Sequence, residues 1–293
     1  MGTHMIYNPI KLSEIVEKNV VYLSNGKIFR KYYRFRATKF YGGSSTGDIV
    51  GCNLSCKYCW SLGTNTSPAI KGIGFYVDPE EAALRLLSIA SQKSFKYIRL
   101  SGGEPTIGFD HILQLLKNIS KSALFDKIRF ILETNGILIG YKKNYAGELS
   151  KFPFVTVRVS LKGCSPNEFN AITGAGEEFY DYQLKAIKYL FENNVDTIVA
   201  ITISFCNKDS FSRLVQQLLE LGEDIIDRIE LEVVKLYPSI AKRLCKSKIY
   251  PWIAIDPRKN VLLRGEAIER ILREGCRGNV DKDPSRSQGR LNI

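Results

Sequence analysis

Short apolar runs alternate with amphipathic helical stretches through the middle of this chain. The apolar runs predict six strands, at 48–50, 97–101, 128–133, 155–160, 198–204 and 229–234. Helical periodicity predicts helices between them, at 79–92, 109–121, 141–150, 179–193 and 210–221. Strands that alternate with helices form parallel sheets through right-handed crossovers. The pattern therefore predicts an α/β fold whose strand–helix units are too few for a full eight-stranded barrel.

The N-terminal region carries a hairpin signal. Asn25-Gly26 lies between β-favouring residues, which predicts a type I′ turn. The second strand of this hairpin would be the stretch 27–36, in which lysines and arginines interleave with aromatic residues. Such a stretch is typical either of a surface for single-stranded nucleic acid or of an edge strand protected by basic side chains. We expect the edge strand.

The pattern divides the chain into three parts. We expect a tag remnant and a small β extension over 1–45, a core over 46–237, and a basic, irregular C-terminal extension over 238–293. The first five residues, which include His4, are typical of a cloning remnant and are set aside.

Composition narrows the class of protein. The net charge of +12 favours nucleic acid, an acidic protein or a phosphorylated substrate as partner. No apolar run reaches the roughly 18 residues of a membrane span, so we expect no membrane association. Seven cysteines without a local framework argue against a secreted, disulfide-rich domain. We therefore expect a cytoplasmic protein.

Three of the cysteines form a compact pattern, Cys52-x-x-x-Cys56-x-x-Cys59. Cysteine thiolates are the usual ligands of iron–sulfur clusters, and three of them leave one iron of a cubane cluster open to a further ligand. A zinc site would need a fourth ligand at short range, but the histidines are His4 and His111 and the next cysteine is Cys164. The spacing favours a cluster over zinc or inert buried thiols.

A second motif follows the strand predicted at 97–101. It contains Gly102, Gly103, Glu104 and Pro105. By itself this segment could be an ordinary strand-to-helix turn. Together with the cysteine pattern it resembles the radical S-adenosylmethionine superfamily. In that family the Gly-Gly-Glu-Pro segment receives the methionyl amino group, a role that glycine backbone and an anionic Glu104 side chain would suit.

The resemblance covers about residues 48–237 and implies a partial (β/α)6 TIM-like barrel. It also implies two cofactors, a [4Fe–4S] cluster on Cys52, Cys56 and Cys59 and S-adenosylmethionine on the open iron. A reduced cluster would cleave the sulfonium to methionine and a 5′-deoxyadenosyl radical, which would abstract hydrogen from a substrate. An electron donor such as ferredoxin or flavodoxin is implied as a partner.

Further candidate residues follow the later strands, where parallel barrels gather their chemistry. Glu133, before Thr-Asn-Gly, and Ser160-x-Lys162 are similar to segments of the activating enzymes of glycyl-radical enzymes. That likeness implies that Glu133 and Ser160 contact the ribose or methionyl portion and that Lys162 contacts the carboxylate. Here Glu133 and Ser160 replace the aspartates usual in those enzymes. Tyr58 is expected beside the cluster or adenine, or in the core.

The substrate stays open at this stage. The strand-end segments favour a protein glycyl residue, whereas the Cys-Trp pair, Ser-Gly-Gly-Glu-Pro-Thr and the positive charge resemble wyosine-forming tRNA-modifying enzymes. The alternative is a non-catalytic iron–sulfur protein that binds nucleic acid on the same fold. The cysteines at 164, 206, 245 and 276 lack any Cys-x-x-Cys pair, so we expect isolated buried thiols rather than a second cluster.

Overall fold

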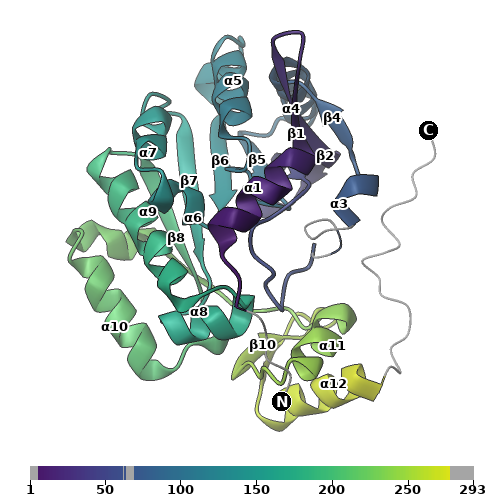
Figure 1. The fold of residues 1–293 in the computed structure, drawn as a ribbon, viewed down its shortest axis with the longest axis vertical. Coiled ribbons are helices and arrows are strands. Elements are labelled where there is room, and N and C mark those ends of the chain that lie inside the picture. The colour runs from purple at the N-terminus through teal and green to yellow at the C-terminus, as the bar shows by residue number, and fades with distance from the viewer. Residues whose placement is uncertain (1–5, 62, 64–68, 278–293) are drawn as a thin grey trace.

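Six parallel strands form the centre of one sheet (Figure 1). The computed structural model describes residues 6–61, 63 and 69–277. The strands lie in the order β3 (Ser44–Ile49), β5 (Tyr97–Ser101), β6 (Arg129–Thr134), β7 (Val155–Leu161), β8 (Asp196–Thr202) and β9 (Ile229–Glu232). Over the described ranges the strand order runs from β1 to β9 without closing. The predicted α/β fold with a partial barrel is confirmed.

Helices cover the outer face of this sheet and bury their apolar sides on it. The larger ones are α4 (Pro79–Lys93), α5 (Phe109–Ser120), α9 (Tyr180–Glu192) and α10 (Lys208–Leu219). Leu86, Ile112, Ile187 and Leu214, one from each, belong to a single buried core with the strands. α4 begins as its sequence predicts, because the Asp78 side chain accepts a hydrogen bond from the backbone N–H of Glu81 at 2.8 Å. None of the helices that the structure describes is long and apolar enough to traverse a lipid bilayer.

The segment predicted as one helix over 141–150 is two short helices. α6 (Ile137–Tyr141) and α7 (Asn144–Leu149) are separated at Lys142, whose φ of −108° and ψ of 84° are not helical. A further helix, α8 (Pro166–Thr173), follows β7 and was not predicted. Its start is fixed by Ser165, whose side chain accepts a hydrogen bond from the backbone of Glu168.

The predicted hairpin is present as β1 (Val21–Ser24) and β2 (Lys27–Thr38). Asn25 and Gly26 both have positive φ, 49° and 73°, as a type I′ turn requires. The helix α1 (Pro9–Val20), which the sequence did not predict, precedes the hairpin and is capped by the Asn8 side chain. The short elements α3 (Ala69–Gly72) and β4 (Phe75–Val77) follow the cysteine loop. The tag remnant expected at the N-terminus lies outside the described residues.

The expectation that the basic stretch forms an edge strand is wrong. β2 pairs with β1 and β4 along part of its length and with β3 along another part. Arg30 is buried and donates hydrogen bonds to the carbonyl oxygens of Ile107 and Val50, at 2.9 and 2.7 Å. Lys31 is buried and donates to two carbonyl oxygens of α3. These cations therefore satisfy backbone acceptors inside the fold.

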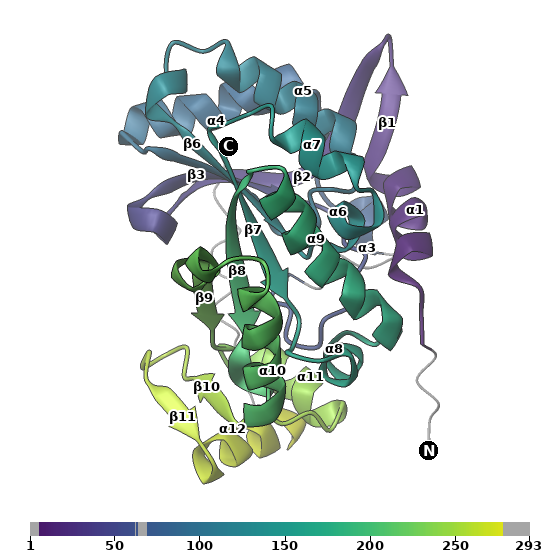
Figure 2. The ribbon, with the colours of Figure 1, turned by 90° about the vertical axis from the view of Figure 1, so that its left-hand side faces the viewer.

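The C-terminal region is regular, contrary to the sequence-based expectation. It contains α11 (Pro238–Lys246), β10 (Ile253–Ile255), β11 (Leu262–Arg264) and α12 (Glu266–Arg277). We refer to residues 238–277 as the C-terminal unit. Ile240, Leu244, Ile268 and Leu272 of this unit belong to a small buried core, which Val234 and Leu236 before the unit complete. Figure 2 shows the unit beyond the arrowhead of β9, at the carboxyl ends of the strands.

Candidate active site

A cavity of about 210 Å³ lies at the carboxyl ends of the parallel strands. Its lining residues come from the loop after β3 and from the ends of four other strands: Cys52, Leu54, Cys56, Tyr58, Cys59, Trp60, Ser61, Ser101, Gly102, Gly103, Glu104, Glu133, Thr134, Asn135, Arg158, Ser160, Lys162 and Glu232. Among the site residues that the sequence predicts, all except Pro105 line this cavity. The fold therefore brings distant parts of the sequence together: Cys52 and Glu232, which both line the cavity, are 180 positions apart.

The three clustered cysteines lie on one loop and are not joined in disulfides. Cys56 is buried, and Cys52 and Cys59 are half-buried. The backbone N–H of Leu54 donates to Cys52 Sγ at 3.4 Å, and Cys59 Sγ lies 3.5 Å from the Ser61 hydroxyl. Burial raises the pKa of the Cys56 thiol to about 12, against the opposing charge of Lys162. A positively charged metal centre would therefore have to displace the thiol proton on binding.

The number and kind of these donors suit an iron–sulfur cluster. The three thiols line one cavity, and each corner of a cubane cluster takes its own thiolate. The three thiols around one cavity thus fit the donor set of a [4Fe–4S] cluster.

The two glycines after β5 let this loop lie directly on the cysteine loop. Gly102 has a φ of 92°, and a Cβ atom on Gly103 would lie 2.1 Å from the carbonyl oxygen of Gly51. The backbone N–H of Glu104 donates to the same oxygen at 2.8 Å. A side chain at Gly103 would push the two loops apart, so the structure requires glycine there for packing between loops.

The Glu104 carboxylate is buried and accepts several hydrogen bonds from other residues of the chain. It accepts hydrogen bonds from the hydroxyls of Thr106 and Thr134, at 2.6 and 2.7 Å, and from the backbone N–H groups of Thr106 and Asn135. Buried carboxylates need such partners. Glu104 therefore joins the loop after β5 to the end of β6 and fixes the floor of the cavity.

Glu133 has the partner that a carboxylate at the end of an apolar strand needs. Its Oε1 lies 3.1 Å from Arg99 Nε, and its Oε2 accepts a hydrogen bond from the Ser101 hydroxyl at 2.7 Å. Arg99 is buried, and Tyr41 also donates to Glu133 at 3.4 Å. These contacts hold the Glu133 side chain at the cavity wall.

Lys162 is part of a charged network that includes Ser160. Its Nζ donates to Ser160 Oγ at 2.5 Å and lies 5.8 Å from the centre of the Tyr58 ring. Burial opposes its charge, but Tyr58, Cys56 and Glu232 outweigh burial and raise the pKa of Lys162. Burial also disfavours ionised Glu232, yet Arg158 and Lys162 lower its pKa. Lys162 is therefore a fixed positive charge beside the cysteine loop.

Several cavity residues were not predicted. Arg158 and Glu232 form an ion pair at 3.0 Å, and Asn135 donates from its amide to Asn53 at 2.7 Å. Arg158 was accessible to sequence reasoning, because residues two apart on a strand share a face and Ser160 had been selected. Glu232 lies inside the last predicted strand, 229–234, and is the final residue of β9. The pairing of Asn53 with Asn135 had no sequence signal, since the two are 82 positions apart.

The remaining four cysteines form two disulfides, Cys164–Cys206 and Cys245–Cys276. The expectation of isolated thiols is therefore wrong. Long sequence separations, 42 and 31 residues, hid the pairing.

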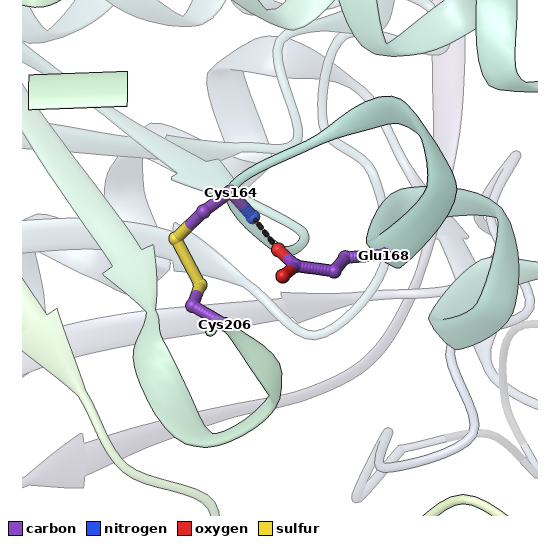
Figure 3. A group of neighbouring side chains, drawn as sticks. All are labelled: Cys164, Glu168 and Cys206. Atoms are coloured by element: carbon purple, nitrogen blue, oxygen red, sulfur yellow. Dashed lines mark hydrogen bonds between the residues drawn. A yellow bond between two sulfur atoms is a disulfide. The ribbon is translucent and has the colours of Figure 1, made fainter. Parts of the chain in front are cut away.

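The Cys164–Cys206 bridge ties the loop after β7 to the segment after β8 (Figure 3). Glu168 accepts a hydrogen bond from the Cys164 backbone at 2.7 Å and others from Asn207 N–H and the Ser210 hydroxyl. The sulfurs bond to each other and the carboxylate is occupied by donors, so this group is a structural link.

The sequence profile of the radical SAM superfamily matches residues 48–218, which is more than half of the chain. The chain belongs to the radical S-adenosylmethionine superfamily. Its cofactors are accordingly a [4Fe–4S] cluster and S-adenosylmethionine, and the predicted cofactors are confirmed at the level of the superfamily.

Two relatives within this superfamily carry the same kind of name. The GTP 3′,8-cyclase of Clostridium perfringens (strain 13) is 31% identical over 192 residues, which cover 64% of this chain and 53% of the relative. The probable GTP 3′,8-cyclase of Metallosphaera sedula is 27% identical over 188 residues, with the same coverage. The chain thus spans about half the length of these relatives.

Solved structures support the fold. HydG, a maturase of the [FeFe]-hydrogenase, superimposes with a TM-score of 0.50 at 16% identity, over 67% of this chain and 46% of HydG. At that identity the likeness concerns the fold alone.

Proposed function

We propose that this radical SAM enzyme holds its cluster on Cys52, Cys56 and Cys59 and its S-adenosylmethionine along the strand ends beside them. The observation that carries the proposal is the single cavity, which joins the three thiols to the ends of β5, β6 and β7. When bound, the reduced cluster supplies the electron that splits the sulfonium and so gives a radical able to abstract hydrogen from a substrate.

The residues of the chain bind and orient the cofactor in this proposal. The backbone of Gly102 and Gly103 takes the methionyl amino group, and Glu104 holds that backbone in place through its contacts with the end of β6. The ammonium of Lys162 pairs with the methionyl carboxylate. Glu133 and Ser160 contact the ribose or methionyl portion, and the Tyr58 ring lies beside the adenosyl moiety. Pro105 is buried, follows Glu104 in the sequence and shapes the turn.

We propose a purine-bearing, anionic substrate, with a tRNA base as the first candidate. The net charge of +12 supports it, and relatives named GTP 3′,8-cyclase act on a purine nucleotide by that name. A protein glycyl residue is the competing substrate. The enzyme needs an external reductant, for which ferredoxin or flavodoxin is proposed, and we propose the cytoplasm as its compartment.

The non-catalytic alternative is an iron–sulfur protein that binds nucleic acid without turnover. Both cysteine and glycine segments are intact around one cavity, which favours the enzyme. The two functions differ in one measurable product, 5′-deoxyadenosine.

The deciding experiment is anaerobic reconstitution with iron and sulfide, followed by assay of 5′-deoxyadenosine with S-adenosylmethionine and dithionite. The wild type should form the product, with more formed when unmodified tRNA, GTP or a glycyl-radical protein is the correct substrate. Cys56→Ala should lose both the cluster absorbance and the product. Cys245→Ser/Cys276→Ser is the matched control, because it removes the disulfide of the C-terminal unit without leaving a free thiol and keeps the three loop cysteines, and it should retain the iron. An intact cluster without product under every substrate condition would overturn the enzyme assignment.

A further inference from the structure

Half of the net charge of this chain is concentrated in its C-terminal unit. Residues 238–277 contain ten lysines and arginines and four aspartates and glutamates, a balance of +6 within the total of +12. The other 253 residues therefore carry the remaining +6. A charge density of this kind creates a local field that attracts polyanions.

These cations face solvent. All ten are exposed except Arg243, which is half-buried. Among the described residues, Arg273 is the one of these ten cations that forms an ion pair, with Glu269 at 3.0 Å. Arg258 and Lys259 stand on the turn between β10 and β11, where only their backbone N–H groups bond to Asp256. Their side chains are available to an anionic partner.

Exposed aromatic rings accompany the charges. Tyr250 is 58% exposed and Trp252 is 49% exposed. Two hydrogen bonds hold Trp252 in place. Its indole N–H donates to the carbonyl oxygen of Ile203 at 2.8 Å, and its backbone N–H donates to the carbonyl oxygen of Ser204. The guanidinium of Arg264 lies 5.9 Å from the centre of its ring.

A cavity of about 510 Å³ adjoins the two rings. Ile268 and Leu272 supply apolar walls, and Glu269 and Arg273 supply polar groups. A planar base could stack against an aromatic side chain here, while its phosphates contact the surrounding cations. RNA supplies both the phosphates that these cations attract and, in every nucleotide, a planar base that the rings can stack on, whereas acidic side chains supply the negative charge alone.

We propose that the C-terminal unit is a docking surface for RNA with a single-stranded segment, in which a base occupies the cavity beside Tyr250 and Trp252. The inference rests on the proposed function, because it names the class of macromolecule that would present a base to the active site. The two sites are adjacent. Arg243, on α11, donates to the carbonyl oxygens of Lys57 and Cys59, and Trp252 bonds to the segment after β8.

The test is direct RNA binding by the full-length reconstituted protein, with an unmodified tRNA transcript and a short single-stranded RNA as probes. Affinity should fall steeply with salt concentration. The double variant Arg258→Glu/Lys259→Glu should weaken binding at least about tenfold and reduce the slope of log affinity against log salt by about two. Tyr250→Ala should weaken binding about tenfold through lost stacking, whereas Tyr250→Phe should bind like the wild type.

The matched control is Lys117→Glu/Lys121→Glu. It makes the same change in charge with exposed lysines at the end of α5, on another part of the molecule. It should leave affinity within about twofold of the wild type, because only local charges contact the RNA.

Equal losses in the patch and control variants would overturn the proposal, because binding would then follow net charge alone. So would tighter binding of polyglutamate than of either RNA, which would indicate an acidic protein partner. Cleavage of S-adenosylmethionine is measured separately without RNA. A wild-type protein that cleaves S-adenosylmethionine but binds neither RNA would refute the docking surface and leave the proposed enzyme standing.

Discussion

Arg243 donates hydrogen bonds to the carbonyl oxygens of Lys57, at 3.1 Å, and of Cys59. The donor lies on α11, more than 180 positions from the cysteine loop. A guanidinium presents several donors in a rigid fork, so it can fix two backbone oxygens at once. The C-terminal unit is thereby attached to the loop that carries the proposed cluster ligands.

Arg243→Ala should therefore loosen the cysteine loop. We expect a loss of about 1.5–3 kcal/mol of local stability, which is the range for hydrogen bonds to a charged group. Reconstituted protein should lose its iron to a chelator several-fold faster than the wild type, measured by the decay of cluster absorbance. Arg258→Ala, an exposed position in the same unit, is the control. Equal decay rates in the wild type and Arg243→Ala would show that the contact does not support the cluster.

Lys162→Met should weaken binding of S-adenosylmethionine. The variant removes the positive charge that we assign to the methionyl carboxylate, and charge-assisted hydrogen bonds contribute about 1.5–3 kcal/mol. The KM for S-adenosylmethionine should rise about tenfold or more, with a smaller change in kcat. Lys162→Arg should recover part of the affinity. Lys185→Met, at a lysine of α9 that does not line the cavity, is the control, and a loss there as large as that of Lys162→Met would contradict the assigned role.

His111 should make the protein less stable in acid. The side chain is buried on α5, with its Nε2 3.1 Å from the Tyr32 hydroxyl, and burial lowers its pKa to about 3. The unfolded chain takes up a proton below about pH 6.5, whereas the folded protein does not until about pH 3. Protons therefore favour unfolding in this window, and stability should fall by up to about 1.4 kcal/mol per pH unit as the pH decreases.

This slope can be measured by denaturant unfolding between about pH 6.5 and pH 4. His111→Gln keeps a hydrogen-bonding group near Tyr32 but cannot titrate, so it should show a shallower slope than the wild type. Identical slopes in the two proteins would mean that other groups cause the acid sensitivity.

The Cys164–Cys206 bridge should stabilise the fold. Closing a loop of 42 residues restricts the unfolded chain, which corresponds to about 4 kcal/mol at most. The double variant Cys164→Ser/Cys206→Ser should unfold at lower denaturant concentration than the wild type. Thiol titration of the unfolded, unreduced wild type should detect three of the seven cysteines. A titre of seven would show that neither disulfide forms.

Periodicity alone predicted the strand–helix core closely except at its first strand, which was predicted over 48–50 and is β3 over Ser44–Ile49. β5 is predicted at both of its ends, β6 is displaced by one residue, and β7 is one residue longer than predicted, because their apolar runs are bounded by clear turn residues. The helix predicted over 141–150 failed because local sequence does not show where a short helix packs and ends. α1 was not predicted, although its apolar residues Ile10, Val16 and Val20 belong to one buried cluster with Val50 and Ile107.

The site was predictable where chemistry depends on local spacing. The cysteines at 52, 56 and 59 are close in the sequence, so their common role can be inferred without a structure. The glycines at 102 and 103 were also predicted, but for approach to a ligand. The structure adds a different reason, the contact of Gly103 with the Gly51 carbonyl oxygen.

The sequence by itself determined the alternation of strands and helices, the cysteine pattern and the excess of positive charge, because each is a property of neighbouring residues or of composition. Only the tertiary structure decided which distant groups meet. Arg30 is buried and donates to backbone oxygens, Cys164 forms a disulfide with Cys206, and Arg243 donates to the cysteine loop. Such pairings form only when the folded core brings together residues that are distant along the chain. The sequence between two partners does not indicate that they will meet.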